Sequence, residues 1–365
     1  MPRVLMAALA TVTALALTTG TAHAAPTTTA EPAAAAPSKV FAATDRLAAQ
    51  VAGALADRAV RDRTASATAS GAADLLTLER DTSLGKAARA ANLTVLAAKG
   101  LPATGGSVLQ VRLANPDMRA ALARGEVPLV AAAPTDDEPT PVTAYDPLGG
   151  KVVLDPVKAP QRPVLVVDVD VAKALPMGLK LVRDTLATHG IVPAKPAAKT
   201  LAGGYWATKV NAIRLNDDKE PWIKGDAEIY SIVGGFGLDG KPAVNIVQMP
   251  YLDNDGTTYY PNQLLVHFSA YKYNLADVVM MEDDGDTNYQ QLAQAIATAL
   301  LTIVDGGAYT PLVNAIISAI PTSWWTDDPD YVDSWYTLST ASSGRRNGAA
   351  GNGWMDVAPY WVSQL

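Results

Sequence analysis

The stretch PVLVVDVDV at residues 163–171 decides the fold of the first half of the chain. Its β-branched residues follow one another almost without a break, which is typical of a strand buried on both faces of a sheet. In the segment that follows, residues 175–189, Leu179, Val182 and Leu186 recur at helical spacing. A buried strand followed by an amphipathic helix predicts a small α/β or α+β domain.

Two further helical segments precede this strand. Leu47, Val51 and Leu55 recur every four residues, which indicates a helix with one buried face. A second predicted helix covers residues 118–124 and ends at a glycine, a residue that favours helix ends. Together these elements predict an N-terminal α/β domain at residues 41–190.

The composition changes sharply after residue 190. Residues 191–204 are rich in Pro, Ala and Gly, which favours a linker. Of the 23 Phe, Trp and Tyr residues in the chain, 21 lie in residues 201–365, together with 19 acidic and only 8 basic residues. A change of this size predicts a second, acidic and aromatic-rich domain at residues 205–365.

Six short β-rich segments separated by Gly, Asn and Asp clusters follow in this second half. They begin at residues 209, 226, 242, 263, 275 and 331. Short strands with such turns predict an antiparallel sandwich. A helical stripe at residues 289–303 and an apolar helix from Pro311 predict a two-helix insertion before the last strand. We therefore expect an α+β fold: an N-terminal small α/β domain plus a C-terminal antiparallel β-sandwich with a two-helix insertion.

The first 24 residues have the pattern of a secretory signal peptide. Arg3 precedes an apolar run at residues 4–17, and the small-residue motif Ala22-His23-Ala24 follows. The run is shorter than the ~20 residues of a membrane-spanning helix, and no later stretch of the sequence is apolar enough to span. We expect a secreted, extracellular protein without a transmembrane segment. Residues 25–40, rich in Ala, Pro and Thr, are expected to form a flexible leader.

Composition and missing motifs exclude several functional classes. The chain has no cysteine, which excludes disulfides, thiolate metal sites and a cysteine nucleophile. Its net charge of −7 argues against a general nucleic-acid binder, which needs a basic face. The sequence contains no HExxH, GxSxG or P-loop motif, and no GxGxxG that opens a helix. We therefore assign no catalytic residue and favour a protein that is not an enzyme.

Acidic clusters are the main candidates for a functional site. Four of them fall between predicted strands, at residues 217–220, 253–256, 282–286 and 327–330. Calcium takes six to eight oxygen ligands, largely from carboxylates and carbonyls on loops, so a bound ion would relieve the repulsion among these charges. The alternative is that they are solvated turn residues, because Asp and Asn favour turns, or that Asp286 caps the following helix. Without a bound ion, replacing a loop carboxylate by an amide should be neutral or stabilising.

Two segments around these clusters resemble calcium-dependent C2-type sandwiches. They are RLNDDKEPWIKGDAEIYSIV, from Arg214, and VVMMEDDGDTNYQQLAQ, from Val278. In such domains, aspartates on two neighbouring loops share calcium ions. The resemblance implies a Ca²⁺ site formed by aspartates of both loops. These residues are Asp217, Asp218, Asp283, Asp284 and Asp286.

The mature chain as a whole is similar to a family of secreted bacterial proteins of unknown function. The stretches PDMRAALARGEVPLV, VTAYDPLGG and RPVLVVDVD carry this similarity, together with the acidic C-terminal half. The family implies no activity. The sequence therefore predicts a secreted protein with a calcium-binding β-sandwich that serves structure or the binding of an extracellular protein or glycan.

A second function remains open from the residues alone. Carboxylates are the abundant reactive groups, and glycoside hydrolysis needs two of them. Aromatic side chains in the same half could stack on sugars, although aromatics in a β domain more often form its core. The alternative prediction is a secreted, glycosidase-like hydrolase or a carbohydrate-binding module.

Overall fold

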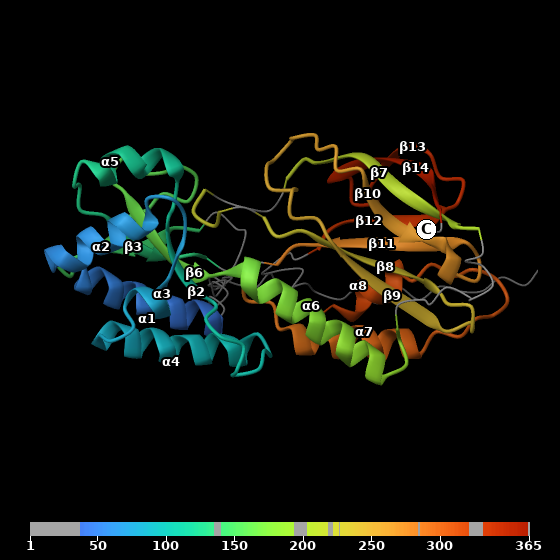
Figure 1. Ribbon diagram of the computed structural model, residues 1–365, viewed down its shortest axis with the longest axis horizontal. Coiled ribbons are helices and arrows are strands. Elements are labelled where there is room, and N and C mark those ends of the chain that lie inside the picture. Colours follow the sequence, from blue (N-terminus) through green and yellow to red (C-terminus); the bar gives the residue numbers. More distant parts are fainter. Residues whose placement is uncertain are drawn as a thin grey trace, which may run out of the picture. The chain divides into compact units, whose positions relative to one another are not determined.

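The computed structural model describes residues 37–134, 140–192, 203–217, 222–225, 227–283, 285–320 and 331–363. The predicted signal peptide and most of the predicted leader lie outside these ranges. Residues 37–365 form one unit in which both halves of the chain contact each other (Figure 1).

The first half is built on a mixed sheet of six strands. Its helices are α1 (Lys39–Ala54), α2 (Arg58–Thr68), α3 (Leu75–Leu78), α4 (Ser83–Ala98), α5 (Arg119–Ala123) and α6 (Val171–Thr188). Its strands are β1 (Ala73–Asp74), β2 (Leu109–Leu113), β3 (Leu129–Ala132), β4 (Val142–Tyr145), β5 (Lys151–Leu154) and β6 (Val164–Val169). The strand order is β1-β2-β6-β3-β4-β5, and β6 runs parallel to β3 and antiparallel to β2.

Strand β6 lies in the middle of this sheet, as its sequence predicts. All six of its residues are buried. Leu165 and Val167 pack into the core under α1 and α4, whereas Val164 and Val166 pack into a smaller core on the opposite face. Helix α6 follows directly because the Asp170 side chain accepts a hydrogen bond from the Lys173 backbone and caps the first turn.

The second half is a sandwich of two four-stranded antiparallel sheets. One sheet has the order β10-β7-β14-β13 and the other β12-β11-β8-β9. The strands of the first are β7 (Tyr205–Leu215), β10 (Gln263–His267), β13 (Gly344–Asn347) and β14 (Gly353–Val362). Those of the second are β8 (Tyr230–Phe236), β9 (Pro242–Gln248), β11 (Leu275–Met281) and β12 (Tyr331–Ser339). A shared core that includes Val210, Met355, Val233 and Val278 joins the sheets.

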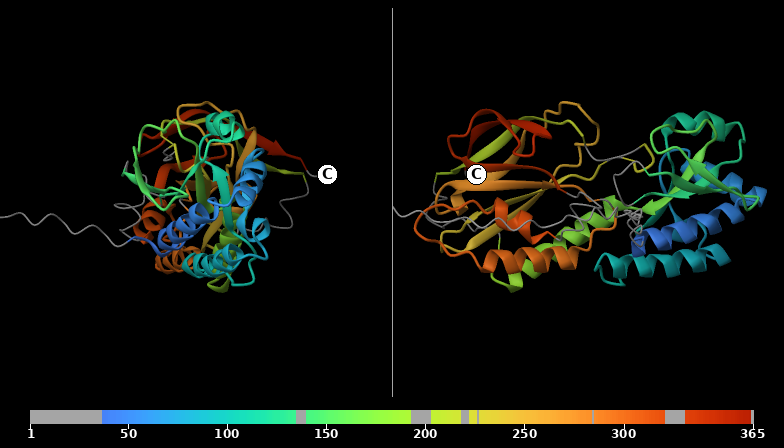
Figure 2. Two further views of the ribbon diagram at one scale, coloured as in Figure 1. Left: turned by 90° about the vertical axis from the view of Figure 1, so that its left-hand side faces the viewer. Right: turned by 180° about the vertical axis from the view of Figure 1, so that it is seen from behind.

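Helices cover the outer face of only one of these sheets in the described part of the chain. Helices α7 (Tyr289–Leu301) and α8 (Val313–Ala319) leave the sandwich between β11 and β12, which confirms the predicted two-helix insertion and the α+β fold. Ile232 on β8 and Ile296 on α7 belong to one core with residues of α1, α4 and α6. Figure 2 shows α6 and α7 side by side along this sheet.

Helix α6 therefore packs against a helix of the second half of the chain. The predicted linker falls mostly on residues 193–202, outside the described ranges. Separate folding of residues 41–190 and 205–365 stays a prediction, and limited proteolysis at the predicted linker would test it.

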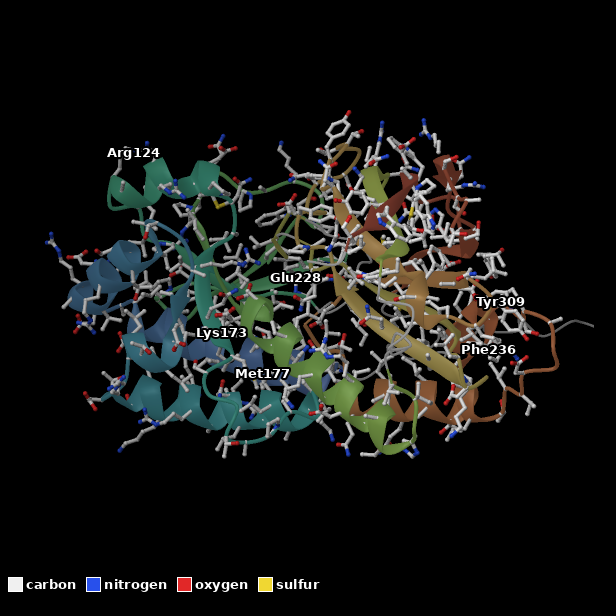
Figure 3. All side chains as sticks on the ribbon, turned by 45° about the vertical axis from the view of Figure 1, so that its right-hand side comes forward. Arg124, Lys173, Met177, Glu228, Phe236 and Tyr309 are labelled. Carbon is white, nitrogen blue, oxygen red and sulfur yellow. The ribbon has the colours of Figure 1, made fainter. Side chains whose placement is uncertain are left out.

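A half-buried carboxylate ties the segment between α7 and α8 to the turn before β11. Asp305 accepts hydrogen bonds from Lys272 Nζ and Tyr273 Oη, both at 2.5 Å. Nearby, the rings of Phe236 and Tyr309 meet edge to face with centroids 6.1 Å apart (Figure 3). The hydrogen bond from Lys272, followed by those from Tyr273 and the Gly307 backbone, lowers the pKa of Asp305 to about 2.

We expect the Lys272→Met variant to raise the pKa of Asp305 back toward its ordinary value of 3.8. The folded-state pKa is depressed, so the stabilising contribution of Asp305 is present above pH 3.8 and is lost as the pH falls toward 2. Carboxyl chemical shifts measured by NMR across pH 1.5–6 would check this. An unchanged Asp305 pKa in the variant would contradict the assigned cause.

Candidate functional site

The predicted calcium ligand Asp283 lies in a buried ion pair. Lys99 Nζ is 3.2 Å from Asp283 Oδ1, and neither side chain is exposed. The Tyr289 hydroxyl donates to Asp283 Oδ2, and Lys99 Nζ lies 4.9 Å from the centroid of the Tyr289 ring. The charge of Asp283 is therefore offset by a lysine that is distant in sequence.

Backbone contacts between two helix ends build this pair. Lys99 is the C-terminal cap residue of α4, and its carbonyl accepts from the Tyr289 backbone N–H at the start of α7. Asn288 donates its side-chain amide to the Ala98 carbonyl and accepts from the Gln291 N–H. Asn288 is thus the cap of α7, the role that the sequence suggested for Asp286.

The other predicted metal ligands lie in different surroundings. Asp217 is exposed just after β7, where its backbone N–H donates to Asn352 Oδ1 at 3.1 Å. Asp286 is half-buried between β11 and α7. Asp218 and Asp284 lie outside the described residues. Within the described ranges, no three His, Asp or Glu side chains form a group that could hold a metal ion.

The two acidic loops nevertheless border one cavity. It opens at the carboxyl ends of the parallel strands β3 and β6, where ligands often bind in sheets with parallel strands. The loop between β7 and β8 contributes Lys224 and Glu228, and the loop after β11 contributes Asp283 and Gly285. Asp168, at the end of β6, lines this cavity and an adjoining groove.

A largely buried arginine anchors this region. Arg112 Nε donates to Asp168 Oδ2 at 2.6 Å, and its Nη2 donates to the backbone carbonyls of Ile223 and Lys224. Burial raises the pKa of Asp168, and the adjacent Arg112 guanidinium opposes part of that rise. These groups hold the β7–β8 loop against the first sheet, so we interpret them as structural.

A second candidate surface is the outward face of the sheet β10-β7-β14-β13. At one end of this sheet, Trp206 on β7 pairs with Trp361 on β14, with ring centroids 5.2 Å apart in an edge-to-face arrangement. Strand alternation places this pair on the side of Val210 and Val357 and places Tyr360 on the outward face. The side chains of Trp206, Tyr360 and Trp361 are 45%, 44% and 44% exposed. Three large aromatic side chains are thus accessible within a short stretch of two neighbouring strands.

Polar and charged residues share this surface. Lys209 Nζ lies 5.5 Å from the centroid of the Tyr360 ring, and the Arg345 guanidinium lies 4.0 Å from that of Trp354. On the same face, the Asn211 amide donates to Asp356 Oδ1 at 3.2 Å. Hydrogen-bonding groups and aromatic rings therefore lie side by side on this face. This combination can recognise a ligand that has both polar groups and apolar faces.

The sequence contains a signal for this surface that the strand prediction did not use. In β14 the buried residues Met355 and Val357 alternate with Trp354, Asp356 and Ala358, which places the second set on the outer face. Strands β13 and β14 were not predicted, because their surroundings are rich in Gly and Asn, which favour turns.

No helix in the described ranges combines the length and apolar character needed to cross a bilayer.

Comparisons with known proteins place the chain in a family. Neither the curated proteins nor the solved structures include a match to the chain. A family model described as "Protein of unknown function (DUF3103)" matches residues 43–365. The match covers nearly all of both halves, and the chain belongs to the DUF3103 family.

Proposed function

We propose that the protein is secreted and that its C-terminal sandwich binds an extracellular glycan on the outward face of the sheet β10-β7-β14-β13. The observation that carries this proposal is the exposed ring of Tyr360, which shares that face with Trp354 and Lys209. An aromatic ring offers a flat apolar surface to the C–H groups of a sugar, while neighbouring polar groups bind its hydroxyls. Secretion rests on the signal-peptide pattern of residues 1–24.

The contrast between the two sheets supports this choice of surface. In the sheet β12-β11-β8-β9, the outward residues Tyr230, Ile232 and Phe236 are buried against the helical layer. On the outward face of the other sheet, Tyr360 keeps 44% of its surface accessible. Exposed aromatic groups are characteristic of interaction sites.

We expect the Tyr360→Ala variant to bind a recognised glycan roughly two- to tenfold more weakly, because an aromatic contact contributes about 0.5–1.5 kcal/mol beyond its area. Co-sedimentation with insoluble polysaccharides, followed by titration of soluble fragments, would measure this. The matched control is Tyr336→Ala on β12, whose ring is 39% exposed and whose hydroxyl donates to Asn314.

Two outcomes would contradict the glycan proposal. One is that the wild-type protein binds no polysaccharide in a panel that covers plant, bacterial and animal glycans. The other is that Tyr336→Ala weakens binding as much as Tyr360→Ala, because the decisive contacts would then lie on the other sheet.

Calcium binding by the acidic loops is a second candidate function. It is supported by one cavity that both loops border; its lining includes Glu228 and Asp283, and the described aspartates Asp217 and Asp286 lie on the same two loops outside the lining. We propose Asp217, Asp218, Asp284 and Asp286 as ligands of a Ca²⁺ ion that stabilises the sandwich. Asp283 contributes less to this site than the sequence predicts, because Lys99 already offsets its charge.

We expect calcium to raise the melting temperature relative to chelator. Binding to the folded state alone adds ~2.7 kcal/mol at a hundredfold excess over Kd, which corresponds to a rise of roughly 5–11 °C. The double variant Asp217→Asn/Asp286→Asn should shrink this shift. If metal-free protein melts at the same temperature with and without added calcium, the loops are solvated turns.

A further inference from the structure

The charge on the uncovered sheet face points to one class of glycan, an inference that rests on the proposed glycan-binding function. We infer that the ligand is an acidic polysaccharide whose sugar carboxylates or sulfates bind Lys209 and Arg345. Both residues lie on the outward face, and they flank the central strand β14 from β7 and β13.

The distribution of basic residues carries this inference. Residues 201–365 contain 19 acidic and only 8 basic side chains. The strand register places Arg345 opposite Asp356, Lys209 opposite Ala358 and Arg214 opposite Trp354, so these basic residues share one face. Among the residues that the structure describes, Asp356 contributes a carboxylate to this part of the face. An acidic half that gathers scarce positive charge on an exposed face is complementary to an anion.

The two cations are placed to contact a ligand. Among the described residues, neither Lys209 nor Arg345 forms a salt bridge, whereas the Arg214 side chain lies against Gly256 in a neighbouring loop. The cation of Lys209 lies over the Tyr360 ring and that of Arg345 over the Trp354 ring. A cation held against a ring keeps its other side open to solvent, where a carboxylate or sulfate can approach.

The spacing of these cations favours a polymer over a single sugar. Lys209 and Arg345 lie on strands separated by β14, and the residues opposite them on β14, Ala358 and Asp356, are two positions apart. Strand geometry puts their backbones ~12 Å apart, farther than one sugar ring extends. A chain with a negative charge on successive units could engage both.

Histidine does not supply the positive charge of this face at neutral pH. His267 Nδ1 lies 3.0 Å from the Tyr205 hydroxyl, and burial lowers the pKa of His267 below 6.5. Its ring is therefore neutral at pH 7, and recognition of an anion there depends on Lys209 and Arg345.

The test uses the full mature chain at pH 7 with three soluble probes: polygalacturonate, chondroitin sulfate and neutral dextran, each at 50 and 500 mM NaCl. We expect at least tenfold tighter binding to one of the acidic probes than to dextran, and weaker binding at high salt. A preference for polygalacturonate indicates recognition of carboxylate, and a preference for chondroitin sulfate indicates recognition of sulfate.

The double variant Lys209→Met/Arg345→Met should reduce binding of the preferred acidic probe at least tenfold without lowering the melting temperature. The matched control, Arg58→Met/Lys180→Met, removes two exposed charges from α2 and α6. Equal loss in both double variants would overturn the inference. Preferential binding of neutral glycans that depends on Tyr360 would overturn it and leave the proposed function standing, whereas binding of no glycan would overturn both.

Discussion

The Asp283→Asn variant is expected to lower the free energy of unfolding by about 3–5 kcal/mol, because it leaves the Lys99 ammonium buried without its charged partner. Neither side chain of the pair is exposed, and the Asp283 carboxylate also accepts hydrogen bonds from the Tyr289 hydroxyl and the Gly285 backbone N–H. Urea unfolding followed by fluorescence would measure the change. If repulsion among loop carboxylates dominated, Asp283→Asn would instead leave the free energy of unfolding unchanged or raise it, because the variant removes one of the repelling charges.

Two variants separate the ion pair from a general effect of the loop. The double variant Lys99→Met/Asp283→Leu removes both charges and should recover much of the lost stability, since a buried pair can often be replaced by apolar residues. Asp305→Asn breaks an ion pair with Lys272, whose side chain is 42% exposed, and should cost clearly less stability than Asp283→Asn. A loss below 1 kcal/mol for Asp283→Asn would contradict the assigned role.

The Gly178→Ala variant is expected to destabilise the protein by about 1–3 kcal/mol through overpacking. A Cβ atom at this position of α6 would lie 2.3 Å from three atoms of the Tyr289 ring. The ring is fully buried and its hydroxyl holds Asp283, so it has little room to move. Thermal unfolding would measure the loss.

A matched glycine tests whether this loss comes from the contact between α6 and α7. Nothing lies within 4 Å of a Cβ built at Gly53 of α1, so Gly53→Ala should stabilise the protein by up to ~1 kcal/mol through helix propensity. Combined with Tyr289→Ala, the Gly178→Ala change should become neutral or stabilising. If Gly178→Ala is still destabilising without the ring, steric contact with Tyr289 is not its cause.

The sequence predicts best those elements whose local pattern matches their burial. Strand β6 is apolar on both faces because it is central in the sheet, and its predicted position is correct. Helix α6 begins at Val171, four residues earlier than predicted, because Asp170 caps it and Pro176 is tolerated inside it. Strand β14 contains Pro359 and follows a Gly-rich turn, and both features disfavour a strand prediction.

The environment of the acidic residues could not be predicted, because it depends on contacts between distant segments. Asp283 belongs to an acidic run, and nothing near it in sequence indicates that Lys99, 184 residues earlier, offsets its charge. The outward face of the second sheet depends likewise on the register of β7, β13 and β14. Lys209 and Arg345 reach one surface through the pairing of separate strands, which the local sequence does not reveal.

Hydrogen–deuterium exchange with and without the preferred polysaccharide tests the glycan-binding face most directly. The proposal predicts that the glycan slows exchange in peptides from β7 and β14, which carry Lys209 and Tyr360, and leaves β8 and β9 of the other sheet unchanged. Protection confined to β8, β9 or the helical layer, with β7 and β14 unaffected, would contradict it.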